Sequence, residues 1–310
     1  MAAVVLAGPV LARLVPSVAQ AESITAVRQI VRVPCSAAAL STALSAANVV
    51  PAALRLAAGC SYQITATLTV SGTVSLFGGP STAIRPAAGF TGRLLDVSTT
   101  GRLRVQGISI LDGNGNLDDE GVGIRNAGSL VLNFVTVSGN TANNGDGAGV
   151  ANLEGARALI AHSFIGANNA TGSEALGSGV GGGVLNRGSL TLFKSRLSAN
   201  TAGENGGGLA TDVTGTSRVV QSTIDHNFAA ITGGGILNSG FTSLDRTLVV
   251  RNRAGTGGGG IQNSGTITAR SDGRSACVDA NGRGSPSECR TPDGARSSQG
   301  EERRVRDEHA

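Results

Sequence analysis

The sequence predicts an all-β fold, a parallel β-helix (solenoid) in which coils of about 25 residues stack along one axis. Two observations lead to this prediction: a Gly–aliphatic marker recurs along the chain, and aliphatic residues stand at fixed distances before a recurring asparagine. Composition is a third, because the 310 residues include 47 Gly but only 7 Phe, 1 Tyr and no Trp. Compact globular cores normally rely on large rings. This chain must therefore bury small aliphatic side chains over a long surface.

The first 21 residues are similar to a secretory signal peptide. Residues 2–11 form a short apolar stretch, and Ala-Gln-Ala at 19–21 fits the small-x-small pattern of a cleavage site. No basic residue precedes the apolar stretch and Arg13 interrupts it, which indicates a truncated signal or a start that lies upstream. We expect a secreted or cell-surface protein. No apolar run reaches the ~18 residues that span a bilayer, so no transmembrane segment is expected.

Residues 30–60 are predicted to form an N-terminal cap for the solenoid. A helix is expected over 37–48, because Ser36 is a good N-cap and three apolar residues follow at helical spacing: Leu40, Leu44 and Ala47. This helix would cover the exposed end of the stack, which such repeat proteins need.

Cys35 and Cys60 flank the predicted helix. A disulfide between them would close a loop of about 26 residues and contribute about 3 kcal/mol on the chain-entropy estimate. Two buried free thiols are the alternative. Export favours the disulfide, because secreted proteins keep such bonds oxidised.

The repeats are predicted over residues 61–269, and their first marker is a Gly followed by an aliphatic residue. The aliphatic residues are Ile124, Val150, Val184, Leu209, Ile236 and Ile261, at intervals of 26, 34, 25, 27 and 25. The long interval contains an insertion around 172–179. Glycines before each marker fit a tight turn with positive φ or a close backbone approach. Looser matches at 68–76, 84–97 and 105–110 indicate the opening coils.

The second marker is an asparagine that recurs once in each of the later coils: Asn140, Asn168, Asn200, Asn227 and Asn252. Three residues before it stand Val137, Ile165, Leu197, Ile224 and Val249, and eight before it stand Leu132, Ile160, Leu192, Val219 and Leu244. Apolar and polar residues roughly alternate around both positions, which is typical of strands with one buried face. The offset between the positions is odd, so a bend or bulge must separate them if both point inward. Equivalent side chains would then stack about 4.8 Å apart as internal columns.

A further asparagine lies two residues after the first marker, at Asn126, Asn152, Asn186, Asn238 and Asn263, with Thr211 in the exceptional coil. Stacked amides can hydrogen-bond along the solenoid axis. A plain preference of Asn for turns is the alternative. Both interpretations give these residues a structural role.

The segment Gly-Gly-Gly-Ile-Leu-Asn at 233–238, the segment Ser-Thr-Ile-Asp-His-Asn at 222–227 and Phe-Ile-Gly-Ala-Asn at 164–168 resemble the repeats of bacterial polymorphic outer membrane proteins. They are also similar to the wider group of secreted right-handed parallel β-helix repeat proteins. The resemblance covers roughly 30–269 and implies right-handed winding and a surface-facing role. It implies no enzyme activity.

The repeat stops near Ala269. Arg274 stands where the pattern requires an aliphatic residue, and Cys277 where it requires Asn. The tail over 270–310 has few apolar residues, so we expect it to be disordered or the product of a reading-frame shift. Cys277 and Cys289 are interpreted as incidental thiols.

We assign no catalytic, cofactor-binding or metal-ligating residue. Glycosidic hydrolysis usually needs two facing carboxylates, and the Asp-Asp pair at 118–119 is isolated. His162 and His226 lie at different offsets from their asparagines and do not share a column. The stretch 112–120 begins like a calcium loop but has Leu117 in place of the Gly, so a solvated turn is favoured. Asp146 and Glu204 stand in comparable loops of other coils, and an acidic edge is the alternative.

The resulting hypothesis is a non-catalytic exported scaffold or adhesin-like repeat protein with an unknown surface or envelope partner, either glycan or protein. A carbohydrate-active enzyme with a divergent site and a non-functional fragment of a longer repeat protein are the alternatives. Nucleic-acid binding is not expected: the formal charge is +4, yet the repeats show no basic cluster with stacking aromatics.

Overall fold

The computed structural model describes residues 29–116, 119–172 and 178–270. The predicted signal at 1–21, the tail from 271 onward with Arg274, Cys277 and Cys289, and residues 117–118 lie outside the described residues. The predictions made for those segments therefore stay predictions.

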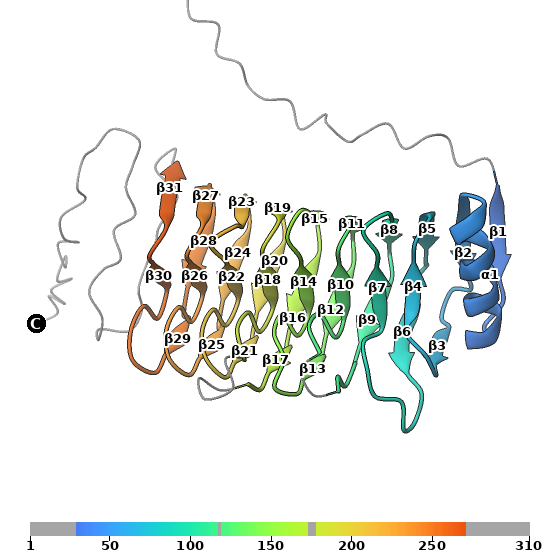
Figure 1. The fold of residues 1–310 in the computed structure, drawn as a ribbon, viewed down its shortest axis with the longest axis horizontal. Helices are drawn as coiled ribbons and strands as arrows, with labels where there is room; N and C mark the ends of the chain where they lie inside the picture. Colours follow the sequence, from blue (N-terminus) through green and yellow to red (C-terminus); the bar gives the residue numbers. More distant parts are fainter. Residues whose placement is uncertain (1–28, 117–118, 173–177, 271–310) are drawn as a thin grey trace, which may run out of the picture.

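The described chain is an all-β parallel solenoid, as predicted, with coils stacked side by side along one axis (Figure 1). Its strands form four parallel sheets, which we name A to D. A complete coil runs through sheets C, A, B and D in that order, as β10, β11, β12 and β13 show. Sheet A contains β1 (Ile30–Val33), β2 (Ala52–Leu56), β5 (Thr73–Phe77), β8 (Arg102–Gln106), β11 (Ser129–Asn133), β15 (Arg157–Ala161), β19 (Ser189–Phe193), β23 (Thr216–Val220), β27 (Phe241–Asp245) and β31 (Thr266–Arg270).

The other three sheets are built from shorter strands. Sheet B contains β3 (Ser61–Ile64), β6 (Ala83–Pro86), β9 (Ser109–Leu111), β12 (Thr136–Ser138), β16 (Phe164–Gly166), β20 (Arg196–Ser198), β24 (Thr223–Asp225) and β28 (Leu248–Val250). Sheet C contains β4 (Leu68–Val70), β7 (Leu95–Val97), β10 (Ile124–Asn126), β14 (Val150–Asn152), β18 (Val184–Asn186), β22 (Leu209–Thr211), β26 (Ile236–Asn238) and β30 (Ile261–Asn263). Sheet D contains β13 (Thr141–Ala142), β17 (Asn169–Ala170), β21 (Thr201–Ala202), β25 (Phe228–Ala229) and β29 (Arg253–Ala254).

The predicted columns of aliphatic residues form the core. Register places Leu132 beside Ile160 in sheet A, and Val137 beside Ile165 in sheet B. The same register continues through every later coil to Leu244 and to Val249, and all these side chains are buried. Periodicity in the sequence thus corresponds directly to stacking in space.

The bend required by the odd offset is also present. One residue between sheets A and B takes a left-handed backbone conformation in five successive coils, with φ of 47° to 53°: Phe134, His162, Lys194, Gln221 and Arg246. A left-handed residue reverses the alternation of side chains, so strands on both sides of the bend can point their aliphatic residues inward. We call these five residues the bend row.

The glycine directly before the aliphatic marker allows the backbones of neighbouring coils to approach closely. A β carbon on Gly183 would lie 2.6 Å from the carbonyl oxygen of Gly208 in the next coil, which no side chain can accept. Two residues earlier, Gly181 has a φ of 72°. Both uses of glycine expected from the sequence therefore occur in this turn.

Buried asparagines form two ladders that run from coil to coil. In the first, Nδ2 of Asn168 donates to Oδ1 of Asn200 at 3.0 Å, and Asn200 repeats this with Asn227 at 2.9 Å. In the second, Asn126 donates to Asn152 at 2.7 Å. These bonds confirm a structural role along the axis rather than a mere turn preference.

Where Thr211 replaces the asparagine of the second ladder, hydroxyl groups take over the hydrogen bonding of the missing amide. Ser217 occupies an inward position that is aliphatic in earlier coils, and its hydroxyl lies 2.7 Å from that of Thr211. The hydroxyl of Thr242, one coil later, lies 3.2 Å from that of Thr211 and donates to Oδ1 of Asn238 at 2.7 Å. The two extra hydroxyls satisfy buried polar groups that the missing amide would have paired.

The helix α1 (Ala37–Val49) lies at the N-terminal end of the stack (Figure 1). Ser36 is its N-cap and accepts a hydrogen bond from the backbone of Ala39, and the three predicted apolar residues are buried: Leu40, Leu44 and Ala47. The Cys35–Cys60 disulfide is formed. Strands β1 and β2, which flank the helix, already belong to sheet A.

Candidate functional site

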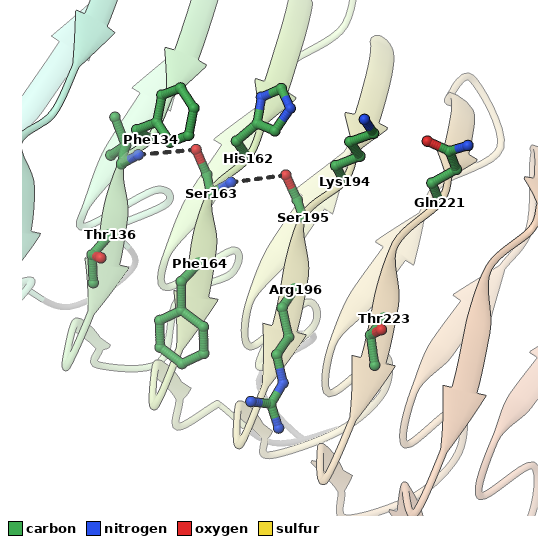
Figure 2. A pocket seen from close by; sticks show the side chains of 11 residues that line it. Phe134, Thr136, His162, Ser163, Phe164, Lys194, Ser195, Arg196, Gln221 and Thr223 are labelled. Atoms are coloured by element: carbon green, nitrogen blue, oxygen red, sulfur yellow. Dashed lines mark hydrogen bonds between the residues drawn. The ribbon is translucent and has the colours of Figure 1, made fainter.

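A shallow groove of about 510 Å³ runs along the corner between sheets A and B. Its outer wall is the first four residues of the bend row, and its other wall is the first residue of each of the strands β12, β16, β20 and β24, as Figure 2 shows. The lining residues are Phe134, Val135, Thr136, His162, Ser163, Phe164, Lys194, Ser195, Arg196, Gln221 and Thr223. Both walls consist of side chains directed outward, whereas the residue between them points inward.

The floor of the groove is a ladder of hydroxyl groups. Oγ of Ser163 accepts from the backbone N–H of Val135 at 3.0 Å and donates to the carbonyl of Ala161 at 2.7 Å. Oγ of Ser195 accepts from the N–H of Ser163 at 3.1 Å (Figure 2). These hydroxyls pair backbone groups left over at the bend, so they fix the spacing of the coils under the groove.

An aromatic cluster stands at one end of the groove. The ring of Phe134, which is 60% exposed, stacks on the ring of His162 with centroids 4.9 Å apart and planes inclined by 15°. His162 also meets the edge of Phe193 at 5.5 Å, and its Nδ1 lies 3.3 Å from Oδ1 of Asn133. The amino group of Lys194 is 5.2 Å from the centroid of the Phe193 ring. Stacking at the coil spacing makes this outer wall rigid.

Phe164 occupies the facing wall. A β carbon on Gly166 would collide with Cζ and Cε1 of the Phe164 ring, so the ring lies along its own strand over Gly166. Neighbouring coils carry Ser138 and Ser198 at the position of Gly166. The glycine therefore gives the ring room to lie on the sheet.

Arg196, Asp225 and His226 form a charged group beside the groove. Nε and Nη2 of Arg196 donate to the two carboxylate oxygens of Asp225 at 2.8 and 2.5 Å, and Nδ1 of His226 lies 2.6 Å from Oδ2. Burial alone would raise the pKa of Asp225, but the hydrogen bonds from Arg196 and His226 outweigh it and hold the pKa below the ordinary 3.8. Asp225 is therefore ionised and neutralises Arg196.

This lowered pKa predicts a loss of stability in acid. A carboxylate with a lowered folded pKa stabilises the protein fully above its ordinary pKa of 3.8, and the contribution disappears as pH falls through the folded value. We expect Asp225→Asn to cost about 1 kcal/mol near neutral pH, because Arg196 is half exposed. The difference in Tm between the natural protein and this variant should shrink from about pH 5 to about pH 2. A difference that does not change with pH contradicts the assignment.

A second charged cluster joins four coils on another face. Arg187 pairs with Glu120 at 2.5 Å, with Asp212 at 3.1 Å and with Asp146 at 3.4 Å. Burial lowers the pKa of Arg187, but the hydrogen bonds that Arg187 donates to Glu120 and Asp212 outweigh burial and raise the pKa. Burial raises the pKa of Asp146, against hydrogen bonds from the backbone of 179 and 180. The cluster links coils across the inserted loop.

In the loop that resembled a calcium site, the three carboxylates that the structure describes pair with three different arginines. Asp112 lies 2.9 Å from Arg85, Asp119 lies 3.0 Å from Arg93, and Glu120 belongs to the Arg187 cluster. Within the described ranges, no group of three or more His, Cys, Asp and Glu is placed to hold a metal ion. The observed pairing favours the interpretation as a polar turn.

Sequence reasoning missed the groove. It placed His162 and His226 in different columns, and the structure puts them in different bends. The sequence prediction did not use the fact that one position in successive coils, six residues before the asparagine marker, holds Phe134, His162 and Lys194. The occurrence of rare residue types at one outward position of the repeat is the signal from which the site could have been predicted.

The chain matches no protein-family model, no curated protein and no solved structure in the comparisons with known proteins. No helix in the described part of the chain is both long and apolar enough to cross a membrane.

Proposed function

We propose that this protein is a non-catalytic exported scaffold with an adhesin-like role, which binds a surface or envelope partner through the groove between sheets A and B. The observation that carries the proposal is the gathering of rare residues at this groove. Three of the seven phenylalanines, the single lysine and one of the three histidines meet there. Exposed aromatic and cationic side chains on a rigid frame are typical of recognition surfaces.

The arrangement of the groove supports recognition rather than turnover. Its hydroxyls donate to backbone carbonyls, and its rings stack on one another, so the side chains are held in place by mutual contacts. A preorganised surface of this kind lowers the entropic cost of binding. The coil-by-coil design also lets a partner contact several layers at once.

The finer features of the fold belong to the same proposal. The resemblance to polymorphic outer membrane protein repeats implies a right-handed solenoid exposed at a cell surface. In this view α1 acts as the N-terminal cap, which fits its place at the end of the stack and its buried apolar side. The Cys35–Cys60 disulfide fits an oxidising compartment.

Binding to intact cells of the organism that carries the gene tests this proposal. Labelled natural protein should bind the cell surface, and Phe134→Ala should bind about 3- to 10-fold more weakly, because an exposed aromatic contact is lost. Phe228→Ala is the matched control: this phenylalanine is also exposed but lies in sheet D, away from the groove.

Two outcomes would contradict the proposal. Equal binding by Phe134→Ala and the natural protein would remove the groove from the function. Release of reducing sugars or unsaturated products from acidic polysaccharides, by protein at micromolar concentration, would show that the protein is an enzyme.

A further inference from the structure

We propose that the partner in the groove is an anionic glycan chain, with one sugar ring against Phe164 and an acidic group beside Lys194. This inference rests on the proposed function, because it names the chemical class of the partner. Aromatic rings are common platforms for sugars, and three of the seven phenylalanines of the chain are concentrated here.

The platform is the ring of Phe164. Because the ring lies along β16 over Gly166, it presents a flat apolar surface beside the groove rather than a projecting edge. The apolar C–H face of a pyranose packs against such a ring. In the same wall Thr136 stands one coil before Phe164 and Thr223 two coils after it, beyond Arg196, and their hydroxyls can pair with hydroxyl groups of neighbouring sugar units (Figure 2).

The positive charge of the residues that line the groove favours an acidic group on the glycan. Lys194 and Arg196 line the groove in one coil, and the lining residues include no carboxylate. Arg196 is neutralised by Asp225, whereas Lys194 contacts the Phe193 ring and has no carboxylate partner within the described part of the chain. The groove therefore offers one uncompensated cation, one coil away from Phe164.

The distance between successive coils favours a linear glycan over other anionic polymers as the partner. Successive coils lie about 4.8 Å apart, close to the length of one sugar unit, so a chain along the axis meets equivalent positions in each coil. A nucleic acid is bound through many basic contacts and unobstructed stacking, and this groove has two cations. An acidic peptide supplies the charge but lacks the flat C–H face that fits Phe164.

Calorimetric titration of the purified protein at low salt tests the class of partner. The probe is alginate, a linear polyuronate; the comparisons are alginate with esterified carboxylates, poly-L-glutamate and oligo-dT. We expect binding to alginate that weakens with salt, and at least about tenfold weaker binding to the ester and to poly-L-glutamate. Equal binding to poly-L-glutamate overturns the proposal, since charge alone would explain it. Tighter binding of oligo-dT overturns it in favour of nucleic acid.

Three variants test the site itself. Phe164→Ala should weaken alginate binding about 5- to 10-fold, and Lys194→Gln about 2- to 5-fold with a smaller salt dependence. Gly166→Ala leaves every lining side chain unchanged but displaces the Phe164 ring, so it should weaken binding as Phe164→Ala does. Phe228→Ala is again the control, and equal Tm values show that the variants fold. Full affinity in Gly166→Ala with an unchanged Tm would contradict the platform.

The two proposals fail in different ways. If alginate and other polyuronates do not bind, but binding to intact cells still depends on Phe134, the glycan class is wrong and the scaffold function stands. If cell binding is insensitive to every groove variant, the function itself is wrong.

Discussion

Asn200→Asp is expected to lower the free energy of unfolding by about 3–5 kcal/mol at neutral pH. Asn200 is fully buried in the middle of the longer ladder. Its Nδ2 donates to Oδ1 of Asn227 at 2.9 Å and to the carbonyl of Ile165 at 3.0 Å, and its Oδ1 accepts from Asn168 at 3.0 Å. A carboxylate keeps the acceptor but replaces the donor by a second acceptor. Two oxygens would then face each other, and a charge would be buried.

The loss should depend on pH in a defined direction. Burial disfavours the charged form, so the introduced Asp has a folded pKa above its unfolded value of about 3.9. Its destabilisation is therefore smallest below about pH 4 and grows as pH rises toward the raised folded pKa. Urea unfolding of both proteins at a series of pH values measures this directly.

Asn205→Asp provides the control for this substitution. Asn205 lies in the same coil, and among the described residues its side chain bonds only through Oδ1, which accepts from the backbone and hydroxyl of Thr232 at 3.1 and 2.7 Å. Aspartate supplies the same acceptor, so a change within about 0.5 kcal/mol is expected. If the two substitutions destabilise the protein equally, the ladder does not have the role assigned to it.

The repeating parts of this fold could be predicted because one residue position in the sequence becomes one column in space. The inward columns through Leu132 and Val137 obey a simple burial rule in every coil, so five repeats were enough to identify them. The helix after Ser36 followed from local signals, an N-cap and apolar spacing. The disulfide followed from the two flanking cysteines together with the expected export.

The groove could not be found by the same rule because outward positions are free to vary. Phe134 and His162 are 28 residues apart and become stacked neighbours only because the bend aims both outward. Arg187 and Glu120 are 67 residues apart, and their contact crosses several coils, so no pairwise periodicity predicts it. The repair of the Thr211 coil by Ser217 and Thr242 likewise needs the register of three coils.

Removal of the Cys35–Cys60 disulfide is the other change with a large expected effect. The two cysteines are separated by 25 residues, and a bridge of this span stabilises a protein by about 3 kcal/mol through the unfolded chain. Cys35→Ser combined with Cys60→Ser should therefore lower the free energy of unfolding by about 2–5 kcal/mol. The natural protein treated with a reductant should behave in the same way, and the variant should not respond to the reductant.

The loss should be local, which distinguishes it from the loss caused by Asn200→Asp. In a solenoid each coil contacts only its neighbours, so weakening one end frees that end first. The bridge lies beside α1 and next to Tyr62, a buried side chain whose hydroxyl accepts from Ala57 at 2.9 Å and donates to Val33 at 3.0 Å. Hydrogen exchange should accelerate over 30–64 well before it does over the central coils. Uniform acceleration along the chain would show that the stack unfolds as one unit and that the bridge stabilises it globally.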